Sequence, residues 1–477
     1  MTLTTGDLTT TPVRHERPVL STAGLVTILL GAALPIVDFF VVNVALQTID
    51  ADLGAGPTML ELVVAGYGIA YATLLVLGGR LGDRYGRRRL FGIGLTAFTL
   101  TSLICGIAPN AGTLVAARAA QGAASALMLP QVLSTITATT SGDRRARAFG
   151  AYGAVGGMGT VIGQLLGGVL VAANVAGTGW RPIFLINVPI GIAGLLLAKR
   201  TMPDTRATDP ARPDAVGTVL LGATMLALLV PLMTGRTLHW PLWTIGLLVA
   251  VPVLAVLFVR NQRAQERAGR LPLLPPSVVG LRSMRTGLIA AVPFFAGFGG
   301  FMFVYAVALQ SGLRFGPVAA GLAITPMAVA FFTMSLVAPR LVRRYGRRVI
   351  LTGIAIQVTG LLAMAGTAAV AWPHLGVATL APAMVVFGAG QGMVMTTLFR
   401  VILAEVPADL AGVGSGALAT TQQTALALGV ATLGSLFVAL AAPGALGVRA
   451  AFLVALGVYA LAGAVFAVLS RHLPDPR

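Results

Sequence analysis

Charged residues are scarce in this sequence of 477 residues, of which only 10% are charged and 56% are hydrophobic. A soluble globular protein carries about a quarter charged residues, so this chain lacks the charge for a water-facing shell. The mean hydropathy is +0.88, which implies that lipid replaces water over most of the surface. The composition therefore predicts an integral membrane protein.

Cysteine is nearly absent, and the single Cys105 excludes an intrachain disulfide. The four histidines are scattered without metal-ligand spacing. The sequence also lacks a phosphate-binding Gly-Lys-Ser/Thr loop and a nucleophile elbow. These absences predict a protein that is not an enzyme, binds no metal or cofactor, and does not hydrolyse ATP.

Positive charge is in excess, with 33 Lys and Arg against 15 Asp and Glu and a net charge of +18. The basic residues form short clusters between apolar runs, which favours anionic membrane lipid as their partner and argues against nucleic acid. All of them except Lys199 are arginine. This bias, with the abundant Ala and Gly, is typical of GC-rich bacteria, and we expect a bacterial inner-membrane location.

Apolar runs long enough to cross a bilayer, which takes about 20 residues, occur fourteen times and are separated mostly by short loops. They predict an all-α integral membrane fold with fourteen transmembrane helices. The predicted spans lie near residues 20–49, 57–79, 90–108, 111–137, 148–173, 182–198, 215–235, 240–259, 286–311, 317–338, 349–370, 374–399, 410–441 and 450–470.

The basic residues orient these spans, because cytoplasmic loops are enriched in Lys and Arg. With both termini in the cytoplasm, alternate loops contain nearly all of the 33 basic residues. The exceptions are Arg181, Arg236, Arg314 and Arg449 in the opposite loops and Arg118 within a span. An omitted or extra helix would scramble this alternation, which supports the count of fourteen.

An internal repeat relates residues 80–88 to residues 340–348, since seven of the nine positions are identical. Each copy follows a predicted span, the second and the tenth. The repeat predicts two pseudo-symmetric six-helix bundles with two inserted central helices, and such halves can rock about a central site. We expect a cytoplasmic tail (1–18), an N-terminal bundle (19–200), a linker with spans seven and eight (201–270), and a C-terminal bundle with a short tail (271–477).

Three charged residues fall inside predicted spans, where each costs about 2.5–3.5 kcal/mol on insertion scales. Asp38 in span one and Arg118 in span four lie ~16 Å and ~10 Å below the same outer face, at 1.5 Å per residue. An Asp38–Arg118 interaction is therefore geometrically allowed, and Asp38 is a candidate for proton binding. Glu61, one turn into span two, either takes part in coupling or favours a helix N-terminus at the surface.

Neutral polar residues in the spans are candidates to line a substrate cavity or to join helices. Asn43 and Gln47 share one face of span one, and Gln121 shares a face with Arg118. Span five has a run of glycines three or four residues apart, which indicates either close helix packing or a sliding seam between the halves.

The loop after span two contains Gly82, Asp83, Arg84, Gly86, Arg87 and Arg88. Its glycines permit a tight turn, and its carboxylate can bind a neighbouring arginine or a helix N-terminus in one conformation. We name residues 82–88 the latch loop. The alternative is a positively charged anchor, which explains the arginines but neither Asp83 nor the glycines.

Four ordered motifs resemble those of the major facilitator superfamily, and of its fourteen-span drug:proton antiporters. The loop 79–89 resembles the signature loop after span two, and Leu114 to Ala126 resembles the span-four motif for proton coupling. Residues 38–46 resemble the acidic motif of span one, and residues 180–189 the start of span six.

This resemblance implies proton-coupled efflux of an amphiphilic drug or antibiotic, with the proton gradient as the energy source. It also implies that Asp38 binds the proton, that Arg118 is its coupling partner, and that Asp83, with Arg84 and Arg87, forms a conformational latch. We expect a monomer whose partners are the small-molecule substrate, protons and membrane lipid.

Two departures from the family pattern stand out. The exporter motif on span five has Gln164 where proline is usual, and its remaining residues are Gly159, Gly163, Gly167 and Gly168. Gln47 replaces the usual proline at the end of span one. The alternatives to drug efflux are a proton-coupled carrier of one metabolite and a non-transporting membrane sensor.

Overall fold

The computed structural model describes residues 20–140, 142–206, 214–235, 238, 240–270, 272–406 and 411–475. The predicted tail (1–18) lies outside these residues. The described part of the chain is helical and contains no β-strand. The predicted all-α class is therefore confirmed.

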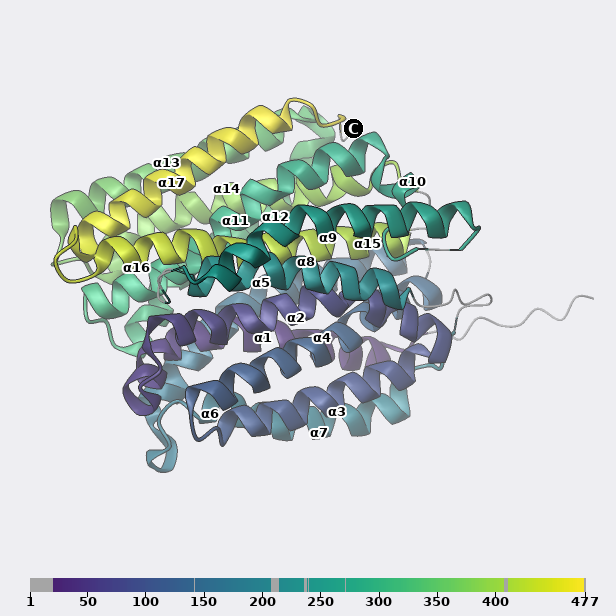
Figure 1. Ribbon diagram of the computed structural model, residues 1–477, viewed down its shortest axis with the longest axis horizontal. Helices are drawn as coiled ribbons and strands as arrows, with labels where there is room; N and C mark the ends of the chain where they lie inside the picture. The colour runs from purple at the N-terminus through teal and green to yellow at the C-terminus, as the bar shows by residue number, and fades with distance from the viewer. Residues whose placement is uncertain are drawn as a thin grey trace, which may run out of the picture.

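The helices of the first part of the chain run along the long axis of the molecule and occupy one side of it (Figure 1). Short helical turns interrupt the chain before α7, where the predicted sixth span begins. The elements are α1 (Thr22–Leu53), α2 (Gly56–Tyr85), α3 (Arg87–Gly106), α4 (Ala111–Thr139), α5 (Gly142–Ala173), η1 (Val175–Gly177), α6 (Pro182–Leu185) and α7 (Asn187–Thr201).

A two-helix hairpin and a second set of long helices follow, and the second set fills the opposite side of the molecule (Figure 1). The hairpin is α8 (Ala215–Thr234) and α9 (Leu242–Arg267). The second set is α10 (Pro276–Val279), α11 (Arg282–Val307), η2 (Ala308–Gly312), α12 (Pro317–Tyr345), α13 (Arg348–Ala371), α14 (Val377–Leu403), α15 (Ala411–Gly429), η4 (Val430–Gly434), α16 (Ser435–Ala441) and α17 (Gly447–Ser470).

Twelve helical segments among the described residues are long and apolar enough to cross a membrane. The helices α4 and α5, of 29 and 32 residues, are not among the twelve. The membrane-spanning character predicted from composition is thus confirmed at twelve spans, and the count of fourteen stays a prediction.

Local sequence explains where the helices of the first bundle begin and end. Ser21 caps α1, because its side chain accepts a hydrogen bond from the Gly24 amide at 2.9 Å. At the other end Gly54 adopts φ +57°, a left-handed conformation that suits glycine and ends the helix. The joint between α2 and α3 is made by Gly86 at φ +99°.

The same kind of helix contact occurs in both halves. In the first, Gly78 and Gly122 let α2 and α4 approach until a side chain at either position would strike the backbone of the partner helix. In the second, Gly388 and Gly392 do the same for α14 against α12. Small residues at such contacts permit close packing of membrane helices without a hydrophobic driving force.

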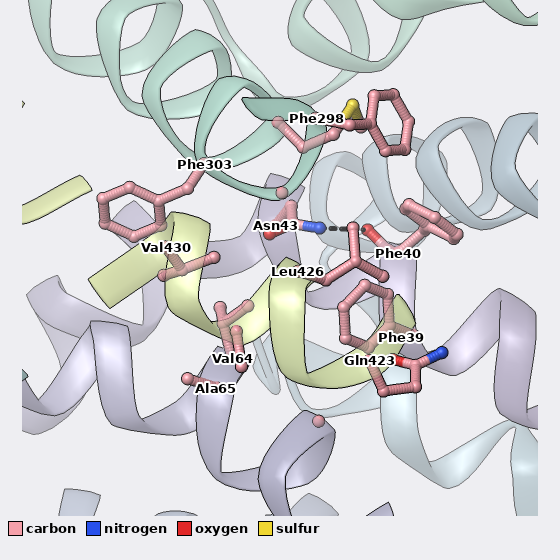
Figure 2. A pocket seen from close by; sticks show the side chains of 14 residues that line it. Phe39, Phe40, Asn43, Val64, Ala65, Phe298, Phe303, Gln423, Leu426 and Val430 are labelled. Carbon is pink, nitrogen blue, oxygen red and sulfur yellow. Dashed lines mark hydrogen bonds between the residues drawn. The ribbon is translucent and has the colours of Figure 1, made fainter. Parts of the chain in front are cut away.

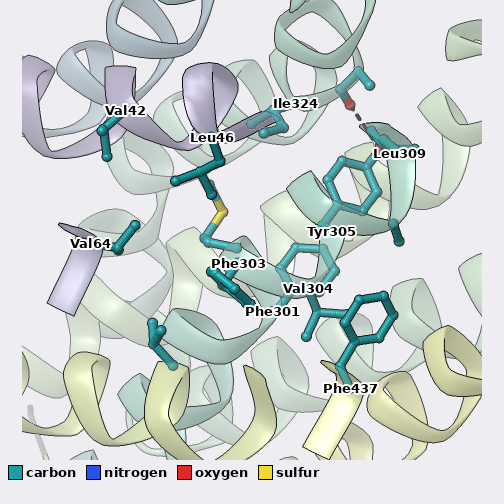
Figure 3. Packing of buried hydrophobic residues seen from close by; sticks show 14 of the residues in the cluster. Val42, Leu46, Val64, Phe301, Phe303, Val304, Tyr305, Leu309, Ile324 and Phe437 are labelled. Carbon is teal, nitrogen blue, oxygen red and sulfur yellow. Dashed lines mark hydrogen bonds between the residues drawn. The ribbon is translucent and has the colours of Figure 1, made fainter. Parts of the chain in front are cut away.

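The two halves meet along two pairs of helices, α5 with α12 and α2 with α15. A buried apolar cluster crosses this boundary (Figure 3). There Leu46 of α1 and Val64 of α2 belong to the same cluster as Phe303 and Tyr305 of α11. The halves are therefore packed against each other in this structure.

The α8–α9 hairpin packs against both halves. Helix α8 packs on α2 and also on α15 and η4, whereas α9 contacts chiefly α8 and leaves most of its apolar side chains exposed. The buried carboxylate of Asp214 caps α8 through the Gly217 amide at 2.7 Å and accepts a hydrogen bond from Gln262 of α9 at 2.8 Å. These polar contacts hold the two helices of the hairpin together.

Candidate functional site

The site centres on Asp38, which lies in the middle of α1 and is fully buried. A carboxylate in this position needs partners, because an unpaired buried charge is strongly unfavourable. Pro35 precedes it by three residues and leaves α1 with one backbone hydrogen bond fewer. Its carbonyl accepts a hydrogen bond from the Tyr67 hydroxyl of α2 at 3.2 Å, which ties this part of α1 to α2.

The principal partner is Arg118 of α4, which is also fully buried and forms an ion pair with Asp38 through Nη1. Its Nε donates to the Val63 carbonyl of α2 at 3.2 Å, and Nη1 also donates to Gln121 Oε1 at 2.6 Å. The guanidinium thus joins α1, α2 and α4. Its Nη2 has no hydrogen-bond partner among the described residues.

Three neutral polar residues complete the network around the carboxylate. Gln121 Nε2 donates to Asp38 Oδ1 at 3.0 Å, and Asn187 Nδ2 of α7 donates to the same oxygen at 2.8 Å. Both amides also donate to the Ser102 hydroxyl of α3, at 2.7 Å and 3.3 Å. The Asp38 carboxylate therefore accepts hydrogen bonds from α4 and α7, and Ser102 of α3 binds both of these donors.

Gln121 is a site residue that the sequence predicts, whereas Asn187 and Ser102 are not. Asn187 lies within the motif of residues 180–189, and an asparagine in an apolar span was the signal that could have drawn attention to it. Ser102 gave no such signal, because serine in a membrane helix commonly bonds to its own backbone.

Aromatic rings enclose the guanidinium. The Arg118 Cζ atom lies 4.4 Å from the ring centre of Tyr67 and 5.7 Å from that of Phe184. Cation–π contacts of this kind favour the charged guanidinium, more so when water is excluded. The site is therefore a fully buried ion pair enclosed by six helical elements, α1, α2, α3, α4, α6 and α7.

Glu61 is buried in α2 and faces the second half of the molecule. Its Oε2 accepts a hydrogen bond from the Ser435 hydroxyl of α16 at 3.2 Å. Two further bonds cross between α1 and η2: Gln47 Nε2 to the Ser311 hydroxyl at 2.8 Å, and Gln310 Nε2 to the Asn43 carbonyl at 3.2 Å. These bonds join α1 and α2 to η2 and α16 across the boundary between the halves.

A small chamber lies between the halves, beside Asn43 (Figure 2). Its lining is apolar and aromatic apart from Asn43 and Gln423, and the Asn43 amide donates to the Phe40 carbonyl at 3.4 Å. The chamber volume is about 20 Å³. A water molecule needs about 10–15 Å³ measured in this way, so the chamber has room for water and not for a drug.

A larger recess of about 610 Å³ lies between α12 and α14, within the second half. Its lining is apolar apart from Thr325 and Thr333. Both hydroxyls donate to carbonyls of their own helix, at 3.4 Å and 2.8 Å. The recess therefore has little polar chemistry with which to orient a ligand.

The latch loop contacts the chain that follows α7. Asp83 Oδ1 accepts a hydrogen bond from Arg87 Nη2 at 2.8 Å, and the Arg87 amide donates to the Thr205 carbonyl at 3.0 Å. Arg88 lies 3.8 Å from Asp204, and Arg84 stacks beside the ring of its neighbour Tyr85. Gly82 leaves room for the amide of Gln131, which donates to α2.

The glycine face of α5 packs on α1. Gly159, Gly163 and Gly167 lie against Ile36, Val37 and Val41 of α1, and Gly168 is also buried. In this structure these three glycines make a helix contact within the first half, as the packing interpretation expects. The contact of α5 with α12 includes Gln164 and Leu165, whose backbone atoms lie beside Gly321 of α12.

Comparison with known proteins places these features in a family. The model of the family described as Major Facilitator Superfamily matches residues 28–430. A probable actinorhodin transporter of Streptomyces coelicolor is 38% identical over 86% of this chain and 71% of its own. A puromycin resistance protein of Streptomyces alboniger is 35% identical over 86% of this chain and 80% of its own. Among solved structures, a peptide transporter in complex with sulfate matches with a TM-score of 0.68 at 16% identity, covering 96% of this chain and 97% of its own.

Proposed function

The chain belongs to the Major Facilitator Superfamily, and from that premise we propose that it is a proton-coupled secondary transporter that exports amphiphilic drugs or antibiotics. Its similarity to an antibiotic transporter and an antibiotic resistance protein supports the substrate class. The observation that carries the coupling is the buried Asp38–Arg118 pair. A carboxylate costly to bury as a charge is suited to take up a proton on one side of a membrane and release it on the other.

The roles follow from the contacts. Asp38 binds the proton, and Arg118 favours its return to the charged form by pairing with it. Gln121 Nε2 donates to the Asp38 carboxylate and to the Ser102 hydroxyl, so Gln121 orients the ion pair. Gln47 donates to Ser311 of the other half and Asn43 lines the chamber between the halves, so we assign both to the substrate path.

Transport proceeds by alternating access, because the chamber between the halves is closed to a substrate. Drug-sized ligands need pockets of about 300–1,000 Å³, whereas this chamber measures about 20 Å³. The halves must therefore part for a drug to enter. The bonds from Glu61 to Ser435 and from Gln47 to Ser311 must break when the outer side opens.

The proposal includes fourteen spans with both termini in the cytoplasm of a bacterial inner membrane. At 1.5 Å per residue, α4 and α5 are about 43 Å and 48 Å long, which exceeds the ~30 Å of a hydrocarbon core. The arginines of the latch loop then face anionic lipid. The functional unit is a monomer that uses the proton gradient and needs no cofactor.

Proton movement in inverted membrane vesicles tests this function. A pre-formed ΔpH is followed with a fluorescent dye while puromycin, ethidium and tetraphenylphosphonium are added in turn. Wild-type protein should dissipate the gradient with at least one compound, and Asp38→Asn should not. Asp50→Asn is the matched control on the same helix, because an amide oxygen can still accept the hydrogen bond from the Gly56 amide.

The outcomes separate the parts of the proposal. Equal dissipation by wild type and Asp38→Asn removes Asp38 from the coupling step, and Glu61→Gln becomes the decisive variant. A wild-type protein that responds to none of the compounds, but to a single metabolite, contradicts drug export and favours a narrow carrier.

A further inference from the structure

Asn187 occupies an unusual place for a residue in an apolar span. It opens α7 directly after the short turn α6, so it lies where the helix is broken. Its side chain is buried and points its amide at two acceptors, Asp38 Oδ1 at 2.8 Å and the Ser102 hydroxyl at 3.3 Å. Nothing in the coupling scheme above uses this contact.

The segment from Trp180 to Asn187 is held to α1 at both of its ends. At the outer end, Trp180 Nε1 and Arg181 Nη1 donate to Asp52 Oδ2 at 3.0 Å and 2.6 Å. At the inner end, Asn187 donates to Asp38. The two aspartates are about 21 Å apart along α1, at 1.5 Å per residue.

Neighbouring helices fix the segment further. Leu185 fills the space beside Gly106 of α3, and Gly191 of α7 lies against Thr99 of α3, where no side chain would fit. The Asn187 amide therefore reaches Asp38 from a backbone that is anchored on α1 and α3. A donor held in this way is pre-organised and loses little conformational freedom when it binds the carboxylate.

We propose that Asn187 is a positioning residue for proton coupling, which holds Asp38 Oδ1 by a donated hydrogen bond and thereby sets the pH at which Asp38 takes up its proton. This inference rests on the proposed function and adds a residue from α7 to it. A hydrogen bond donated to a carboxylate favours its charged form. Loss of the donor therefore moves proton uptake to higher pH.

Other groups that face Asp38 also affect the pH at which it takes up its proton. They are the Arg118 guanidinium of α4, the Tyr67 hydroxyl of α2 and the Cys105 thiol of α3. On the neighbouring side of α1, α5 presents the backbone of Gly163. These groups are unchanged when Asn187 is replaced. A shift of the Asp38 titration midpoint in the variant therefore reports the contribution of the Asn187 amide.

The experiment is an infrared pH titration of the purified full-length protein in lipid. The band of a protonated carboxyl that is present in wild type and lost in Asp38→Asn reports the proton on Asp38 without any substrate. In Asn187→Ala, the midpoint of this band should move to higher pH by about one unit, the size expected for one hydrogen bond to a charged group.

A second variant distinguishes the loss of this hydrogen bond from a loss of folding. Asn187→Asp keeps the shape of the side chain but places a second carboxylate beside Asp38, so the two should share a proton and the midpoint should move further upward. Gln357→Ala is the matched control, because it removes a buried amide that bonds within the second half. Its Asp38 band should titrate as in wild type.

An unchanged midpoint in both Asn187 variants overturns the positioning role and leaves the proposed function intact. If Asp38→Asn removes no band at any pH, Asp38 takes up no proton, and the proposed coupling fails together with this inference. An equal shift in Gln357→Ala would trace the effect to general loosening and would also overturn the role of Asn187.

Discussion

Gln164 offers a sharp test of how the halves are packed. Its side chain is 1% exposed, and neither its Oε1 nor its Nε2 has a hydrogen-bond partner among the described residues. Its backbone meets Gly321 of α12, so the residue lies on the boundary between the halves. Leucine has nearly the same volume and no polar atoms, so Gln164→Leu removes the unpaired groups without opening a cavity.

The stability change expected for Gln164→Leu follows from the free-energy cost of burying polar groups without partners. Each such group costs about 1–3 kcal/mol, and the two groups belong to one side chain, so we expect a gain of about 2 kcal/mol for the packed arrangement. That corresponds to a factor of about 30 in an equilibrium constant. Gln164→Leu should therefore raise thermal stability in detergent and slow substrate export, because the boundary opens less often.

The matched comparison is Gln357→Leu in the second half. The Gln357 amide donates to Gln391 Oε1 at 2.7 Å and to the Tyr459 hydroxyl at 2.8 Å. Removal of this amide leaves Gln391 and Tyr459 without these hydrogen bonds and should lower the free energy of unfolding by about 1–3 kcal/mol. If Gln164→Leu lowers stability as Gln357→Leu does, the Gln164 amide has a partner in the folded protein and this reasoning is refuted.

Four further substitutions test the helix contacts, the site and the latch loop. Gly122→Ala should destabilise the fold by about 1–3 kcal/mol, because the added methyl group meets backbone atoms of α2. Gly92→Ala has open space and should be neutral or stabilise α3 by up to about 1 kcal/mol, and thermal unfolding of both compares them. Arg118→Lys should reduce drug-dependent dissipation of ΔpH in vesicles at least tenfold, because an ammonium cannot reach acceptors on three helices in one plane; retained coupling would show that charge alone suffices. Asp83→Asn breaks the ion pair with Arg87, yet its half-exposed position limits the loss of stability to under about 1 kcal/mol. Export should fall in this variant while thermal unfolding stays unchanged, and equal losses in both would argue for a structural anchor.

The charged part of the site could be predicted from the sequence because charge in a membrane span is rare and costly. Asp38 and Arg118 stand out in apolar runs, and the rise per residue placed them at similar depths. The structure pairs them directly. Glu61 was also singled out, but its partner Ser435 lies in the other half of the chain, and no local pattern could have indicated that contact.

Other features depend on which helices become neighbours, and periodicity does not contain that information. The glycines of α5 mark a smooth face, but only the structure shows that α1 covers it. The neutral residues Asn187 and Ser102 lie on α7 and α3, far from Asp38 in sequence. An asparagine or a serine in a span does not indicate which residue of another helix it will contact.

One of the helices that hold the candidate site is hard to recognise as a span. Helix α4 is 29 residues long, yet it is not among the twelve segments selected by length and hydropathy. The residues that lower its hydropathy include Arg118, Gln121, Ser125 and Gln131, and all four are buried. Their polar atoms face neighbouring helices and not lipid, for example through the bond from Ser125 to Tyr67 of α2. A membrane helix that serves a buried polar network needs little hydropathy of its own, because its neighbours shield it from the bilayer.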